Sequence, residues 1–127
     1  MPNDDTFARG LEVRRAMFGP EGAEQQTEAA TDFTWPLQDM VTRYCFGEIW
    51  NRPGLDRKQR SMITLAMLVA LGRPHEIKTH VRGGLKNGLS KEEIREILVH
   101  SMLYCGIPAS VDGHRAAGEV FAELGME

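Results

Sequence analysis

Cysteine is scarce in this chain, and its scarcity argues against two classes of protein. Cys45 and Cys105 are the only cysteines among 127 residues, and they form no CxxC pair. Small secreted proteins that depend on disulfides carry many more cysteines, and dithiol redox sites keep two of them close together. We therefore expect a protein of a reducing compartment, without structural disulfides.

Long apolar runs and basic stripes are also missing. The longest apolar run, 62–71 with one threonine inside, has about half of the roughly 20 residues that a membrane span needs. The first ten residues, MPNDDTFARG, show no basic segment followed by an apolar one. Charges of both signs are mixed and the net charge is −3, which disfavours nucleic acid as a partner. We expect a cytoplasmic protein with neither membrane nor nucleic-acid partners.

No strand-like alternation of useful length is present, whereas apolar residues recur at helical spacing along most of the chain. A capping box at Ser90 and Glu93 and a C-terminal stop at Gly88 mark two helix ends. The stretch 62–71 is apolar almost all round, so we expect its helix at the centre of the fold. The prediction is an all-α fold in a single domain, 1–127, with about six helices: 6–18, 35–50, 56–71, 75–87, 90–104 and 109–124. The polar stretch 21–34 could hold a short helix or cross over to a partner subunit.

The four histidines do not form a metal site in the sequence. His75 and Glu76 followed by His80 resemble a zinc-protease motif, but that motif places its histidines four residues apart on one helical face. A spacing of five residues turns them about 140° apart. No other histidine, cysteine or carboxylate cluster has ligand spacing. We expect no metal site.

Two residues stand out as candidates for acid–base chemistry. His80 shares a helical face with Ile77 and Gly84, and the glycine would let another group come close. A structural histidine beside glycines that let helices pack is the competing interpretation. Glu48 could act as a general base or orient a histidine, although a solvated surface glutamate is the commoner case.

Four cations lie within nine residues at the start of the helix predicted over 56–71: Arg52, Arg57, Lys58 and Arg60. A helix start favours anions, and arginine can bind a carboxylate with two parallel hydrogen bonds. The alternative is a solvated charge run. Cations at a helix start oppose the helix dipole, however, so a bound anion would be stabilising there.

The sequence from Gly47 to Pro108 resembles the carboxymuconolactone decarboxylase family. The segments that carry the resemblance are GEIWNRPGLDRKQRSMITLAMLVALGR, HVRGGLKNGLSKEEIREILVH and YCGIPAS. The opening segment GLEVRRAMFG resembles the start of those members that act in protocatechuate breakdown. The resemblance covers most of the chain in the right order.

The same superfamily contains alkylhydroperoxidase D-like proteins, whose redox pair is CxxC followed four residues later by histidine. With that histidine placed at His80, the two cysteine positions are Arg73 and Glu76, and the upstream acidic position falls at Ser61. The resemblance therefore implies the alkylhydroperoxidase D-like fold without thiol-dependent peroxide chemistry.

The resemblance implies cofactor-free decarboxylation of 4-carboxymuconolactone, a lactone with two carboxylates, to 3-oxoadipate enol-lactone. It implies His80 as proton donor or dienolate stabiliser and Glu48 as its orienting or relaying partner. Arg52, Arg57 and Arg60 would bind carboxylates. It also implies a homo-oligomer, with a hexamer as the expected state.

Two other interpretations stay open. One is a related decarboxylase or lactone-processing enzyme that acts on another diacid. The other is a non-catalytic helical oligomer that serves as a binding or stress protein of the same fold. The presence of His80, Glu48 and the arginines together favours an enzyme over the last of these.

Overall fold

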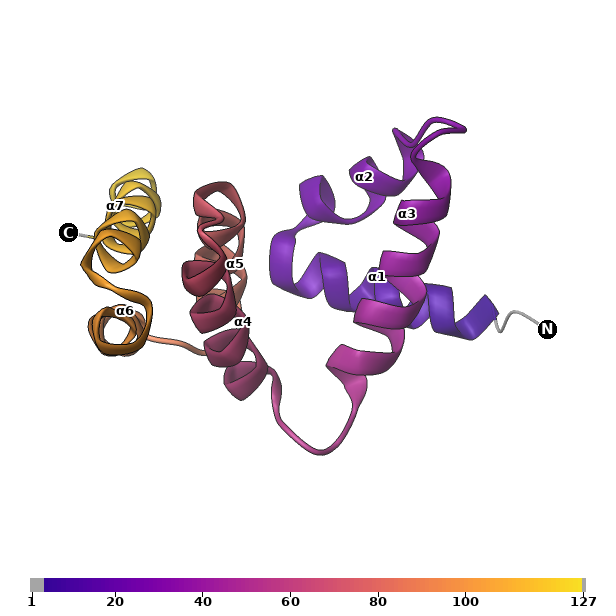
Figure 1. Ribbon diagram of the computed structural model, residues 1–127. Helices are drawn as coiled ribbons and strands as arrows, with labels where there is room; N and C mark the ends of the chain where they lie inside the picture. The colour runs from indigo at the N-terminus through magenta and orange to yellow at the C-terminus, as the bar shows by residue number, and fades with distance from the viewer. Residues whose placement is uncertain (1–3, 127) are drawn as a thin grey trace. The chain divides into compact units, whose positions relative to one another are not determined.

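The computed structural model describes residues 4–126, and every regular element in that range is helical (Figure 1). This confirms the prediction of an all-α fold. The chain divides into two compact units, one ending at Arg57 and the other beginning at Lys58, and each is described separately below. The division does not test the prediction of a single domain. The elements are α1 (Asp4–Phe18), a 3₁₀ turn (Pro20–Gly22), α2 (Glu24–Glu28), α3 (Trp35–Met40), a π-helix (Val41–Glu48), a 3₁₀ turn (Ile49–Asn51), α4 (Arg57–Leu71), α5 (Pro74–Lys86), α6 (Lys91–Cys105) and α7 (Ile107–Glu123).

In the N-terminal unit, α1 crosses the helix formed by α3 and the π-helix (Figure 1). The two pack almost backbone to backbone. A Cβ atom added at Gly10 would lie 1.8 Å from the carbonyl oxygen of Thr42, and one added at Gly47 would lie 2.4 Å from that of Thr6. Only glycine permits so close an approach. Beside this crossing lies a small core of Val13, Met17, Phe46 and Trp50.

Arg14 ties the segment after α1 to the rest of the N-terminal unit. Its buried guanidinium donates to the carbonyl oxygen of Gly22 at 2.8 Å, and to the side chains of Gln38 and Thr42, both at 2.9 Å. Arg15 forms an ion pair with Glu24. The polar stretch 21–34 thus contains a short helix, α2. Side chains of α1 in the same chain bind residues at and just before its start.

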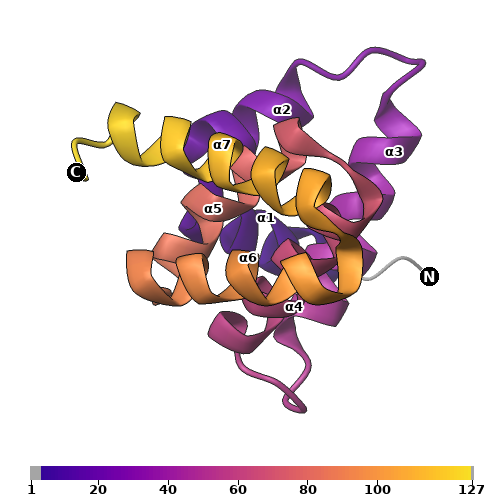
Figure 2. The ribbon, with the colours of Figure 1, turned by 60° about the vertical axis from the view of Figure 1, so that its left-hand side comes forward.

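The C-terminal unit consists of α4 to α7 around one core, with α6 and α7 side by side (Figure 2). The predicted capping box is confirmed: Ser90 accepts from the backbone N–H of Glu93, and the Glu93 side chain accepts from that of Ser90. Gly88 has a φ of 100°, as its predicted helix-stop role requires. The core residues are Leu65, Val69, Ile77, Val81, Leu89, Ile94, Leu98, Ala116, Ala117, Val120 and Phe121.

The prediction that the apolar 62–71 stretch is buried all round was wrong for the chain as described. Leu65 and Val69 are buried. The opposite side of α4, with Met62, Ile63 and Met67, is exposed. A single four-helix unit covers only one face of α4, so the remaining apolar residues lie on the surface.

Candidate active site

His80 lies in the middle of α5 and is half-buried. Ile77 and Gly84, on the same face of the helix, are buried. A Cβ atom at Gly84 would lie 2.9 Å from Cδ1 of Leu89 and 3.6 Å from Cβ of Ser61. The atoms that approach α5 closely at Gly84 therefore belong to Leu89 and Ser61 of the protein itself.

Burial lowers the pKa of His80, and the Glu76 carboxylate, one helical turn earlier, opposes that shift. Desolvation disfavours the charged form of an imidazole, so His80 is neutral at pH 7. A neutral imidazole carries one N–H donor and one acceptor nitrogen. It can therefore donate a hydrogen bond to a developing oxyanion or accept a proton. It can serve as a strong acid only after it has acquired a proton.

Arg60 lies in the first turns of α4 in the same unit as His80, and its side chain is half-buried. The next residue, Ser61, is fully buried, and its hydroxyl accepts a 3.0 Å hydrogen bond from the Asn87 amide. That bond joins the start of α4 to the residue just after α5. Two of the predicted site residues, Arg60 and His80, are thus carried by helices tied to each other within one unit.

The other three predicted residues belong to the N-terminal unit. Glu48, the last residue of the π-helix, is exposed, as is Arg52 just after the second 3₁₀ turn. Arg57 donates to the Asn51 side chain at 3.2 Å, and Asn51 donates to the carbonyl oxygen of Gly47 at 3.2 Å. Arg57 therefore supports the end of the π-helix.

The run of cations at the start of α4 is not uniform. Lys58 forms a 2.9 Å ion pair with Glu93 of α6, so this charge has a partner within the protein. Arg57, which donates to Asn51, likewise has a partner within the protein. The sequence alone placed all four in one group, because it shows spacing and not partners.

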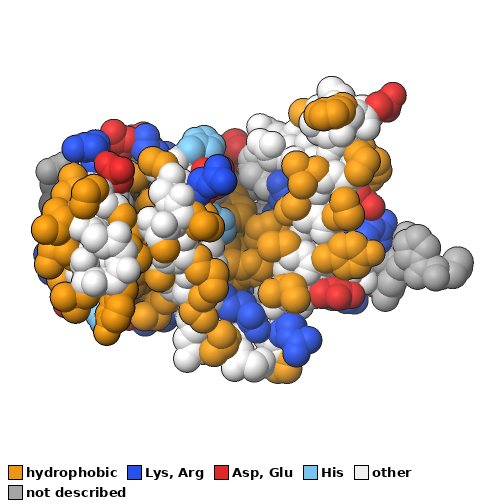
Figure 3. All heavy atoms as spheres, in the orientation of Figure 1, with side chains coloured by type: hydrophobic (Ala, Val, Ile, Leu, Met, Phe, Trp, Pro, Cys, Tyr) orange, Lys and Arg blue, Asp and Glu red, His pale blue; other side chains and the backbone are white. Residues whose placement is uncertain are grey.

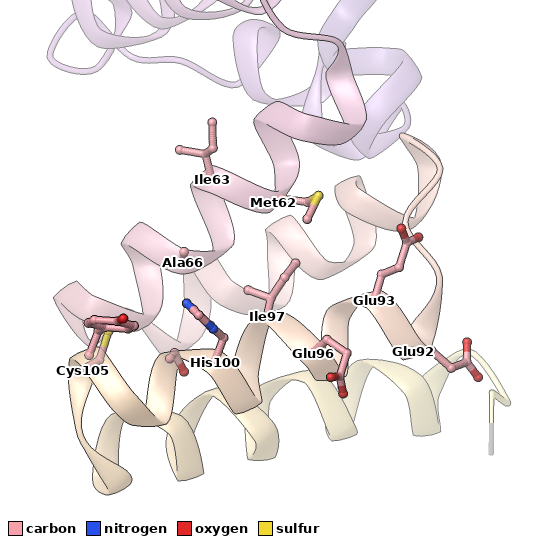
Figure 4. A pocket seen from close by; sticks show the side chains of 11 residues that line it. Met62, Ile63, Ala66, Glu92, Glu93, Glu96, Ile97, His100 and Cys105 are labelled. Carbon is pink, nitrogen blue, oxygen red and sulfur yellow. The ribbon is translucent and has the colours of Figure 1, made fainter.

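A cavity of about 680 Å³ that the sequence did not predict lies between α4 and α6 (Figure 4). Glu96, His100 and Tyr104, spaced four residues apart on α6, line it. That spacing is visible in the sequence, but it does not show that a cavity forms beside these residues. Three glutamates and no lysine or arginine are among the lining residues, which makes the cavity unfavourable for a dicarboxylate. The complete lining is Met62, Ile63, Ala66, Glu92, Glu93, Glu96, Ile97, His100, Ser101, Tyr104 and Cys105.

Within residues 4–126, no group of three or more histidine, cysteine or carboxylate side chains is placed to hold a metal ion. Over the same range, no helix combines the length and apolar character needed to cross a bilayer. Both cysteines are free thiols. Burial raises the pKa of Cys45, which lowers its reactivity at neutral pH.

The chain is similar to known proteins along almost its whole length. The model of the carboxymuconolactone decarboxylase family matches residues 36–119. A 4-carboxymuconolactone decarboxylase from Acinetobacter baylyi is 40% identical over 126 residues, which cover 99% of this chain and 94% of the relative. A nitrosuccinic acid decarboxylase from Metarhizium robertsii is 41% identical over 106 residues, covering 84% of this chain and 74% of the relative. An uncharacterised 15.0 kDa protein from Paracoccus denitrificans is 35% identical over 67% of this chain and 64% of its own length.

These matches define an all-helical, alkylhydroperoxidase D-like protein. The chain belongs to the carboxymuconolactone decarboxylase family. Two relatives with known activities are both decarboxylases, which supports a carboxy-lyase activity in general terms.

Proposed function

We propose that this protein decarboxylates 4-carboxymuconolactone to 3-oxoadipate enol-lactone and CO₂ in the breakdown of aromatic compounds. The observation that carries the proposal is the 40% identity to a 4-carboxymuconolactone decarboxylase along 99% of the chain. The relative is matched over 94% of its own length, so the likeness is not confined to one shared segment.

The chemistry of this substrate is compatible with catalysis by side chains alone. The departing carboxylate is attached to a carbon that is conjugated, through a double bond, to the lactone carbonyl. When the C–C bond breaks, its electron pair is delocalised as a dienolate onto the carbonyl oxygen, and CO₂ departs. A proton is then added at carbon. The protein has to hold two carboxylates, stabilise the oxyanion and direct the proton.

In this proposal His80 is the group that acts on the reacting atoms. Its lowered pKa favours a neutral imidazole in the free enzyme, which can donate a hydrogen bond to the dienolate oxygen. A dianionic substrate would raise that pKa and so assist protonation. Arg60, on the neighbouring helix, binds a carboxylate that persists through the reaction. Glu48 orients His80 or relays the proton, and Arg52 and Arg57 are further carboxylate ligands.

The nitrosuccinic acid decarboxylase relative supports a second candidate substrate. Nitrosuccinic acid also has two carboxylates, and its nitro group can accept the electron pair released with CO₂. The demands on the protein are the same: two anionic groups to bind and one carbanion equivalent to stabilise. The proposal further includes assembly into a homo-oligomer, with a hexamer as the expected state.

CO₂ release from each substrate, measured as kcat/KM, tests the choice between them. We expect a strong preference for 4-carboxymuconolactone, and we expect exhaustive EDTA treatment to leave the rate unchanged. Turnover of nitrosuccinic acid without turnover of 4-carboxymuconolactone would make nitrosuccinic acid the substrate. Turnover of neither would refute it.

Substitutions test the roles. His80→Gln should lower kcat by about 10²–10⁴ with little change in KM, as expected for a positioned proton donor or hydrogen-bond donor. Arg60→Ala should mainly raise KM, because ground-state and transition-state binding weaken together. Arg60→Lys should restore little of the substrate affinity, since a lysine ammonium cannot form two parallel hydrogen bonds with a carboxylate. His114→Gln, at an exposed position on α7, is the matched control. A folded His80→Gln enzyme with wild-type kcat would exclude the assigned role.

A further inference from the structure

The contact between the start of α4 and the end of α5 lies next to two of the proposed site residues. Gly84 of α5 faces Ser61 of α4, because a Cβ atom added at Gly84 would lie 3.6 Å from that of Ser61. Arg60 is the neighbour of Ser61, and His80 lies one helical turn before Gly84. One turn of an α-helix rises only about 5.4 Å. A change in how α4 docks at this contact therefore changes the separation of Arg60 and His80.

A buried hydrogen bond fixes the contact. Asn87 lies three residues after Gly84, on the same face of the helix, and its side-chain amide donates to the Ser61 hydroxyl oxygen at 3.0 Å. Ser61 is fully buried, at 0% exposure, whereas Asn87 is half-buried. Because water does not reach the Ser61 hydroxyl, breaking this bond costs more than breaking a hydrogen bond at the surface.

Two ion pairs that also hold these helices lie at the surface. Lys58 of α4 pairs with Glu93 of α6 at 2.9 Å, and the two side chains are 42% and 38% exposed. Arg82 of α5 pairs with Glu123 of α7, and Figure 3 shows cationic and acidic side chains next to each other over α5 and α7. Exposed ion pairs contribute little to a fixed geometry, because water screens the charges and the long side chains lose conformational entropy. The buried bond between Asn87 and Ser61 is therefore the stronger constraint on where α4 begins against α5.

The main chain of Arg60 moves with α4 rather than independently of it. The hydroxyl of Thr64, one turn later, donates to the Arg60 carbonyl oxygen at 2.8 Å, within the regular helix Arg57–Leu71. The place of Arg60 relative to α5 is thus set by how the start of α4 docks, and the docking is set at Ser61.

We propose that Asn87, through its hydrogen bond to Ser61, is a positioning residue that fixes the separation between the carboxylate-binding Arg60 and His80. The inference rests on the proposed function. A substrate held by Arg60 must present its reacting carbon to His80, and misplacement by about 1 Å can cost on the order of 100-fold in rate. Asn87 and Ser61 act through the two site residues and hold the helices that carry them.

Ser61→Ala gives the sharpest test, because it removes the acceptor without adding atoms to a packed space. Ser110→Ala is the matched control: Ser110 of α7 is also buried, and its hydroxyl donates to the Leu98 carbonyl oxygen of α6 at 2.7 Å. Each change removes one buried hydrogen bond between two helices, so both should destabilise the fold. For a shift of α4 below 1 Å, we expect kcat of Ser61→Ala to fall roughly 10-fold with KM within about 2-fold of wild type. Ser110→Ala should keep the wild-type kcat.

A double-mutant cycle with Arg60→Ala distinguishes positioning from a general loss of stability. Once Arg60 no longer holds the substrate on α4, the docking of α4 against α5 ceases to matter for alignment. Ser61→Ala should then leave kcat unchanged in the Arg60→Ala background, while its effect on urea-induced unfolding persists. Asn87→Ala removes the donor instead of the acceptor and should reproduce the loss of kcat, which covers the case in which Ser61→Ala does not fold.

The rates are measured as CO₂ release from whichever diacid the wild-type protein decarboxylates. A wild-type kcat in folded Ser61→Ala or Asn87→Ala would overturn the inference. The same fall in kcat for Ser110→Ala, or an undiminished effect of Ser61→Ala in the Arg60→Ala background, would overturn it as well. A wild-type protein that decarboxylates neither diacid would instead refute the proposed function itself.

Discussion

The crossing of α1 and the π-helix at Gly10 makes a quantitative prediction about stability. Gly→Ala in a helix interior normally stabilises by up to about 1 kcal/mol, because glycine loses more backbone entropy on folding. At Gly10 the added Cβ atom would lie 1.8 Å from the Thr42 carbonyl oxygen and 2.7 Å from its carbon. These are backbone atoms of a packed helix, so the obstruction cannot be relieved by rotating a side chain.

To remove the clash between the added Cβ atom and Thr42, the two helices must separate by roughly 1–1.5 Å. A gap of 0.5–1 Å already forfeits about a quarter to a half of the dispersion energy at a contact. The same interface holds the buried side chains of Val13, Met17 and Phe46. Overpacking of this kind typically costs about 1–3 kcal/mol, occasionally more. We therefore expect Gly10→Ala to lower the free energy of unfolding by roughly 2 kcal/mol after the helix-propensity gain.

Urea-induced unfolding followed by circular dichroism measures the effect. Gly118→Ala on α7 is the control, because a Cβ atom there meets nothing within 4 Å. That change should raise the free energy of unfolding by about 0.5–1 kcal/mol. The same Gly→Ala change is thus expected to lower the free energy of unfolding at Gly10 and to raise it at Gly118. A Gly10→Ala protein as stable as Gly118→Ala would show that the reasoning about the crossing is wrong.

Two further predictions concern titratable groups. Because the folded-state pKa of His80 lies below its ordinary value of 6.5, the unfolded chain binds the additional proton first, and stability falls as pH drops below about 6.5. Urea midpoints at pH 7.5 and 5.5 should therefore differ less for His80→Gln than for wild type, and equal differences would contradict the assignment. Replacing Cys45 and Cys105 together by alanine should leave kcat within a few-fold, with at most about 2 kcal/mol of lost packing. A loss of activity in that folded variant would show that a thiol takes part.

Local signals in the sequence predicted the helices of the C-terminal unit well. Ser90 and Glu93 fix the start of α6 through two reciprocal hydrogen bonds, and Gly88 marks the stop before it. Such features depend on a few neighbouring residues and can be read without the fold. The wider winding at 41–48 was not predicted, because apolar periodicity is too coarse to distinguish an α-helix from a π-helix over eight residues.

The burial of α4 and the grouping of the arginines could not be obtained in the same way. Apolar residues at Met62 and Ile63 predict burial, but the sequence does not show which side of α4 the chain's own core covers, and both residues are exposed. Arg57 and Lys58 look equivalent in the sequence, yet Arg57 donates to Asn51 whereas Lys58 pairs with Glu93. Those partners lie on other elements, so only the tertiary structure shows them.

The buried Ser61 bears on how easily this fold can change its chemistry during evolution. Regaining the peroxidase pattern of the wider superfamily would need cysteines at Arg73 and Glu76, both exposed at the start of α5. It would also need an acid at Ser61, which is sealed between Asn87 and Gly84. A larger, charged side chain there would lose the hydrogen bond to Asn87 and bury a carboxylate. The first two changes alter exposed side chains, whereas the third places a larger side chain in the packed space between α4 and α5. The core around Ser61 therefore opposes a return to the redox chemistry of the wider superfamily, in addition to the missing thiols.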